Sequence, residues 1–134
     1  MTQDDIKNKN LVLITYLDNI IDDFTVKAEF STDDSNMNVI VVQEDSGDKV
    51  VFYDNDNPLF NYYNVNIYGD NIKQEKETSV IIGQLIGQSV LLDFNKQKWQ
   101  IIFMQMANPR AIEYMEIRRV AYTTTLKCIV NRVA

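Results

Sequence analysis

The N-terminal part of the chain carries apolar side chains at the three- and four-residue spacing of an amphipathic helix. The recurring positions are Ile6, Leu13, Ile14, Leu17, Ile20, Ile21 and Phe24. Thr2 stands three residues before Asp5, which is the spacing of a capping box, and acidic residues stabilise the positive start of a helix. The pattern predicts a helix over residues 4–24 whose apolar stripe faces the core.

Alternating and β-branched stretches predict several strands after this helix. Residues 26–30 and 61–68 alternate apolar with polar side chains, as half-buried strands do. Residues 37–43 form a β-branched run, and residues 49–53 resume the strand pattern after a turn that contains Gly47. We therefore expect residues 37–43 and 49–53 to pair as a hairpin.

The second half predicts a further helix and two long strands. Apolar residues over 74–94 recur at helical spacing, and Gly83 and Gly87 lie four apart, which favours close packing of that helix on a sheet. Residues 99–106 alternate with both faces largely apolar, as in a central strand. Residues 118–132 alternate for an unusual length, which predicts a strand that bends or extends past the sheet.

The order of these elements predicts the fold class. A helix, about four strands, a second helix and two or three strands make an α+β protein, with two helices packed on one face of a mainly antiparallel β-sheet. A chain of 134 residues suits one domain, so residues 1–134 are expected to form a single unit.

The composition argues against an enzyme. The chain has no histidine, which removes the commonest general base and the usual metal ligand. Its single cysteine, Cys128, excludes an internal disulfide and falls on an apolar face, where a buried, inert thiol is expected. The four glycines form no phosphate-binding loop. We therefore expect no catalytic activity and no cofactor.

One acidic turn offers oxygen ligands without the spacing of a known metal site. Asp33, Asp34, Ser35 and Asn36 are suitable ligands for a hard cation, but the glycine and glutamate of a calcium-binding loop are missing. A polar turn is the preferred interpretation, because such side chains bond their own backbone. No metal site is predicted.

The charge is divided unevenly along the chain. Residues 1–60 carry 13 acidic and 4 basic residues, a net charge of −9, whereas residues 61–134 carry 6 and 9, a net charge of +3. The total of −6 argues against sequence-specific nucleic-acid binding, which typically uses a basic domain. Neither a signal segment nor a membrane span is visible, so a soluble protein made in the cytoplasm is expected.

The second half of the chain also resembles a known family. A tyrosine-rich strand over residues 61–68 leads through Gly69 and Asp70 to a helix, followed by a tryptophan-led strand over 99–106. The segment Asn108, Pro109, Arg110 and the run Ile117, Arg118, Arg119, Val120, Ala121, Tyr122 complete the pattern. With the helical start, this order resembles the tail terminator, or tail-to-head joining, proteins of long-tailed bacteriophages, in particular that of a Bacillus phage.

The resemblance implies an assembly protein of the virion. Such proteins have an α+β fold, close the end of the tail tube as a hexameric ring, and join the tail to the head connector. It implies partners in the tail tube protein and the head connector or stopper protein. It also implies assembly in the host cytoplasm and a final place at the head–tail interface.

The charge division suggests how a ring subunit would use its surface. A ring joins one face of a subunit to a different face of the next, so basic and acidic surfaces can meet. The expected interface cations are Arg110, Arg118, Arg119 and Lys127. The expected channel-lining or partner-facing loops contain Asp33, Asp34, Ser35, Asn36, Asp45, Gly47 and Asp48. A solvated acidic surface, a nucleic-acid contact at the arginine pair, a head-completion stopper and a cellular protein-interaction domain are the alternatives.

Overall fold

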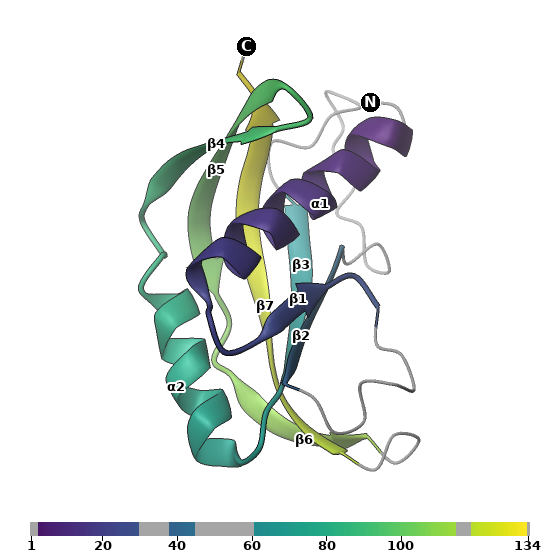
Figure 1. Ribbon diagram of the computed structural model, residues 1–134. Coiled ribbons are helices and arrows are strands. Elements are labelled where there is room, and N and C mark those ends of the chain that lie inside the picture. The colour runs from purple at the N-terminus through teal and green to yellow at the C-terminus, as the bar shows by residue number, and fades with distance from the viewer. Residues whose placement is uncertain (1–2, 30–37, 45–60, 115–118, 134) are drawn as a thin grey trace.

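The computed structural model describes residues 3–29, 38–44, 61–114 and 119–133, and Figure 1 shows how they are arranged. Within these residues two helices and seven strands follow one another along the chain. They are α1 (Gln3–Ile20), β1 (Thr25–Lys27), β2 (Val39–Glu44), β3 (Asn61–Tyr68), α2 (Ile72–Gly83), β4 (Ser89–Phe94), β5 (Gln97–Met106), β6 (Arg110–Tyr114) and β7 (Arg119–Arg132).

The strands form one sheet that is organised around β7. The order across the sheet is β1-β2-β3-β7-β5-β4, and β6 pairs with β7 outside this sequence. β3 occupies one edge of β7, while β5 and β6 share the other edge, one after the other. Of the strand pairs described, β1 with β2 is parallel and the rest are antiparallel. The predicted α+β class and mainly antiparallel sheet are confirmed.

The core lies between α1 and the sheet. Figure 1 shows α1 crossing the sheet, and α2 lower down beside the ends of β4 and β5. Leu13 and Leu17 of α1 are fully buried, as the predicted apolar stripe requires. Against them pack Ile40, Val42, Tyr63, Val65, Ile67, Ile101, Phe103, Leu126 and Val130. Ile82 and Leu85 join the same cluster, whereas the packing of both helices on one sheet face stays a prediction.

The single helix predicted over residues 74–94 is wrong. α2 ends at Gly83, and the backbone turns at Gly87, whose φ of +88° lies in the left-handed region that favours glycine. Residues 89–94 then form β4, with every second side chain turned toward the core. The prediction was misled because Leu85, Ser89 and Leu92 fit helical spacing, although Ser89 is exposed. Gly83 and Gly87 therefore do not share a helix face.

Three smaller differences concern the limits of elements. α1 ends at Ile20 because the chain bends there, although Ile21 and Phe24 stay buried as predicted. β6 was not predicted, because the asparagine and proline before it indicated only a break. The proposed hairpin partner, residues 49–53, lies outside the described residues, and β2 pairs with β1 and β3.

Candidate functional site

The sheet face opposite α1 carries a row of side chains that spans four strands. Val41 of β2 stands opposite Asn66 of β3, Asn66 opposite Thr123 of β7, and Thr123 opposite Arg110 of β6. Residues directly opposite one another in antiparallel strands point to the same face, and neighbouring strands lie about 4.8 Å apart. The pairing therefore gathers an amide, a hydroxyl and a guanidinium group on one surface.

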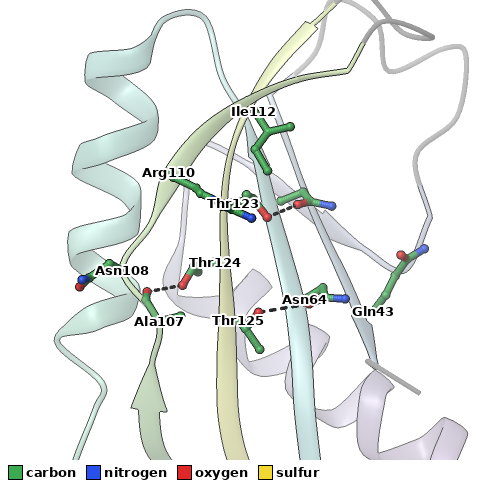
Figure 2. A pocket seen from close by; sticks show the side chains of 10 residues that line it. Gln43, Asn64, Ala107, Asn108, Arg110, Ile112, Thr123, Thr124 and Thr125 are labelled. Carbon is green, nitrogen blue, oxygen red and sulfur yellow. Dashed lines mark hydrogen bonds between the residues drawn. The ribbon is translucent and has the colours of Figure 1, made fainter. Parts of the chain in front are cut away.

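A second polar row lies about 7 Å further along the strands. It contains Gln43, Asn64 and Thr125 in register. The Thr125 hydroxyl donates a hydrogen bond of 3.2 Å to Oδ1 of Asn64, and the Thr123 hydroxyl donates to Oδ1 of Asn66. Figure 2 shows the amide nitrogen of Asn64 turned away from Thr125. Because the amide oxygen accepts this bond, the N–H donors of Asn64 point away from Thr125.

The rows are bordered by a break between β5 and β6. At Ala107 the backbone N–H donates to the Thr125 carbonyl at 2.9 Å, and the Ala107 carbonyl accepts from the Thr124 hydroxyl. After these two hydrogen bonds the chain moves away from β7, and it pairs with β7 again as β6, which begins at Arg110. The result is an open cleft of about 620 Å³, drawn in Figure 2. It is lined by Gln43, Asn64, Asn66, Ala107, Asn108, Arg110, Ile112, Thr123, Thr124 and Thr125.

The charge of this cleft comes from Arg110. None of the described residues that line it is acidic, although the whole chain carries 19 acidic and 13 basic residues. Arg110 is exposed, and Figure 2 shows its side chain lying over its cross-strand neighbour Thr123. A guanidinium is charged at any physiological pH and only donates hydrogen bonds. The cleft is therefore suited to an oxygen-rich anionic group such as a carboxylate.

An acidic surface lies in the turn between α1 and β1. Asp22 and Asp23 are exposed in the turn that leaves the helix layer, and Oδ1 of Asp18 accepts a 3.1 Å hydrogen bond from the backbone of Val26. The C-terminal end of a helix is its negative end and favours cations, yet the last turn of α1 has no basic residue. In the described part of the chain, no ion pair neutralises Asp22 or Asp23.

The structure brings two of the predicted interface cations to the same sheet face. Arg110 lies at the cleft, and Lys127 lies two residues beyond Thr125 along β7, so it has the same orientation in the strand. Arg119 pairs with Tyr114 at the start of β7, but its side chain is not described. Arg118 lies outside the described residues. So do the predicted loop residues Asp33, Asp34, Ser35, Asn36, Asp45, Gly47 and Asp48.

Sequence reasoning missed the amide and hydroxyl groups of the cleft. Asn64 and Asn66 were noticed only as the polar half of an alternating strand. Their threonine partners lie 61 and 57 residues away along the chain, so no local pattern connects them. The single signal available was the repetition itself: alternate asparagines in one strand and alternate threonines in another.

Two buried titratable groups lie on the helix-covered face. Burial raises the pKa of the Cys128 thiol to about 12, so the thiol stays protonated and unreactive at neutral pH. Burial, together with the nearby Glu44 carboxylate, also raises the pKa of Tyr63 far above its ordinary value. The burial predicted for Cys128 is confirmed.

Comparison with known proteins identifies no relative. The chain matches no protein-family model, and it has no significant similarity to a curated protein or a solved structure. Among the described residues, no three acidic or cysteine side chains are grouped as metal ligands would be. Neither described helix combines the length and the apolar content that crossing a bilayer demands.

Proposed function

We propose that this protein is a virion assembly subunit that closes the end of a bacteriophage tail tube as a ring and joins the tail to the head connector. The observation that carries the proposal is the presence of two unlike charged surfaces on different layers of the subunit. The cleft with Arg110 lies on the open sheet face, and the acidic turn with Asp22 and Asp23 leaves the α1 layer.

Distinct, complementary surfaces suit a ring better than a pair. In a two-fold dimer each subunit uses the same patch, whereas a ring joins one patch to a different patch on the next subunit. A subunit whose donor-lined cleft and acidic turn lie on different layers cannot satisfy one with the other. Both surfaces of such a subunit are therefore occupied only when it has a neighbouring subunit on each side.

The order of elements supports the same proposal. The resemblance to tail-joining proteins rests on a tyrosine-rich strand that enters a helix through Gly69 and Asp70, and on a tryptophan-led strand before a long final strand. β3, α2, β5 and the 14-residue β7 follow one another in this way, with β4 inserted after α2. The chemistry of the cleft also supports binding over catalysis. Its hydroxyl, amide and guanidinium groups can form hydrogen bonds to a partner surface, and its described residues do not pair a nucleophile with a base.

The test uses purified protein and tail tubes that lack it. Electron microscopy of the mixture should reveal added density at one end of each tube, and heads supplied afterwards should attach to the capped tubes. Tubes assembled without the protein should be overlong or unable to join heads. Binding to filled heads in preference to tubes would instead identify a head-completion stopper. Binding to neither would reject a role in the virion.

A further inference from the structure

We infer that the cleft around Arg110 is a carboxylate-binding site, and that its occupant is the acidic turn, Asp22 and Asp23, of a second copy of this chain. The inference rests on the proposed assembly function and names the contact through which neighbouring subunits would meet. Each half of the contact is made of described residues.

The donors of the cleft match a carboxylate in number and kind. Arg110 supplies a planar pair of N–H groups, which binds the two oxygens of a carboxylate side by side. Asn64 lines the cleft with its amide N–H groups turned away from Thr125, and Gln43 continues that row. None of the described lining residues is an acid that would compete for these donors. In the described part of the chain, Arg110 also forms no ion pair of its own.

The acidic turn lacks the cation that its position calls for. Two exposed carboxylates, Asp22 and Asp23, add to the negative end of α1 without a basic residue in the last turn. A guanidinium from another molecule would neutralise this repulsion, which gives the acidic turn a reason to bind Arg110. Asp18 is already engaged by the backbone of Val26 and serves to hold the turn in place.

The charge arrangement favours a protein segment over nucleic acid as the occupant. A duplex is held by many cations spread along a surface, whereas the described lining of this cleft has one cation among neutral amides and hydroxyls. A pair of adjacent carboxylates needs only one arginine with supporting donors. The first 60 residues, which contain the acidic turn, have a net charge of −9. A second copy of the chain is therefore an anionic partner that is present wherever the protein is made.

The test measures self-association of the purified chain by nuclear magnetic resonance at low salt. The 15N-labelled protein is mixed with unlabelled protein up to concentrations on the order of millimolar, which detects weak contacts. Signals of the Arg110 guanidinium, the Asn64 amide and the Asp22–Asp23 backbone should shift together. Arg110→Glu, and separately Asp22→Arg with Asp23→Arg, should each weaken association about tenfold or more.

Mixing the two reversed variants separates charge pairing from damage to the fold. Each variant alone should associate only weakly, but an equimolar mixture should recover association, because each reversed surface meets its complement on the other protein. Lys98→Glu and Glu77→Lys change exposed charges elsewhere and should leave association within about twofold of wild type. Association that ignores Arg110→Glu, or a mixture that does not recover, overturns the inference.

Two further results are decisive. A short DNA duplex that shifts the cleft signals more strongly than a second copy of the chain does would assign the cleft to nucleic acid and overturn the contact. Shifts at the cleft in a protein that fails to cap tail tubes would reject the proposed function but keep the contact. Capped tubes without these shifts would reject the contact alone.

Discussion

Asn95 and Lys96 form the tight turn between β4 and β5, and both have a left-handed backbone. Their φ angles are 51° and 63°, as in the two-residue turns whose twist matches that of a hairpin. Asparagine tolerates this region, whereas lysine is strained in it because its Cβ approaches the following carbonyl.

Replacing Lys96 with glycine should stabilise the protein. The relief of backbone strain exceeds the entropy that glycine adds to the unfolded chain, so we expect a gain of about 0.5–1 kcal/mol in the free energy of unfolding. Chemical denaturation measures it. Asn95→Gly is the matched control and should gain less. A loss of stability in Lys96→Gly would mean that the lysine side chain makes a contribution larger than its strain.

Gly69 is required by close packing rather than by its backbone angles. Its N–H donates a 2.7 Å hydrogen bond to Oε2 of the buried Glu75. A Cβ at this position would lie 2.9 Å from Oε1 of Gln74, 3.1 Å from Cγ of Glu75 and 3.3 Å from Cζ of Phe24. A methyl group therefore fits at the strand–helix junction only if Gln74, Glu75 and Phe24 shift.

Gly69→Ala should destabilise the protein by about 1–3 kcal/mol, because the junction must shift to accept the added atom. Thermal unfolding measures the change. Gly83→Ala is the control, since its Cβ would meet only Sδ of Met106 at an ordinary 3.6 Å. The control should be neutral or gain up to about 1 kcal/mol from its helical position. Equal effects of the two changes would contradict the packing argument.

Cys128 predicts a pH dependence of stability. Its pKa is raised from 9.0 to about 12 in the folded protein because the thiolate is excluded from water. Between pH 9 and pH 12 the thiol therefore keeps its proton in the folded state and loses it in the unfolded state. The contribution of the protonated thiol to the free energy of unfolding is complete below pH 9. It is lost as the pH rises toward 12, by about 1.4 kcal/mol per pH unit.

Urea denaturation between pH 8 and pH 11 should therefore show a steeper fall in stability for wild type than for Cys128→Ala. The variant is expected to be less stable at neutral pH, because it leaves space in the core, but to depend less on pH. Parallel curves for the two proteins would contradict the burial of an ionisable thiol. Buried Tyr63 acts in the same direction in both proteins, but the part of its pKa shift that comes from Cys128 is lost in the variant, which adds to the expected difference.

At the scale of elements, β4 is an edge strand whose hydrogen bonding alternates. The Phe103 N–H donates to the Gln88 carbonyl, and the Gly87 N–H donates to the Phe103 carbonyl. Continuing the antiparallel alternation from this pair directs the amides of residues 90, 92 and 94 to β5. The amides of Ser89, Leu91 and Asp93 then point outward, away from the sheet.

Hydrogen exchange should reproduce this alternation. We expect the outward amides of Ser89, Leu91 and Asp93 to exchange much faster than those of Val90 and Leu92. The amides of β7 should be the slowest in the sheet, because that strand has partners on both edges. Uniform protection along β4 in the isolated protein would show that its outer edge is covered.

The sequence was sufficient for the elements whose pattern has one interpretation. α1, β3, β5 and β7 follow from helical spacing or from long alternation, which no other element imitates. β4 was missed because Ser89 and Leu92 follow Leu85 at a spacing that also suits a helix. β6 was missed because a short strand after a proline resembles a loop.

The candidate site was predicted only in part, for a physical reason. Arg110 was identified from its charge, which is a property of one residue. The amide and hydroxyl rows beside it exist only because β3 and β7 pair in a particular register across roughly half the chain. Local spacing contains no information about such pairing, so a neutral site built across strands is invisible in the sequence.

At the scale of the whole molecule, the proposed contact predicts a dependence on salt. Exposed charges are screened over about 10 Å at 0.1 M salt and about 3 Å at 1 M. Self-association of the wild-type chain should weaken as salt rises over this range, when followed by sedimentation. Self-association of the Arg110→Glu variant should depend little on salt, because the charge pairing is already removed. An association that strengthens with salt would indicate apolar contact instead, for which exposed Val80, Ile81 and Leu91 are the candidates.

The central position of β7 has a consequence for how the protein is made. β7 follows every one of its partners in the chain, so β3, β5 and β6 all leave the ribosome before the strand that unites them. Until then β3 and β5 each expose an unpaired edge of the kind that promotes aggregation. Messenger RNAs truncated before the codons of β7 should accordingly yield polypeptides that chaperones bind and proteases degrade, and no partly active protein.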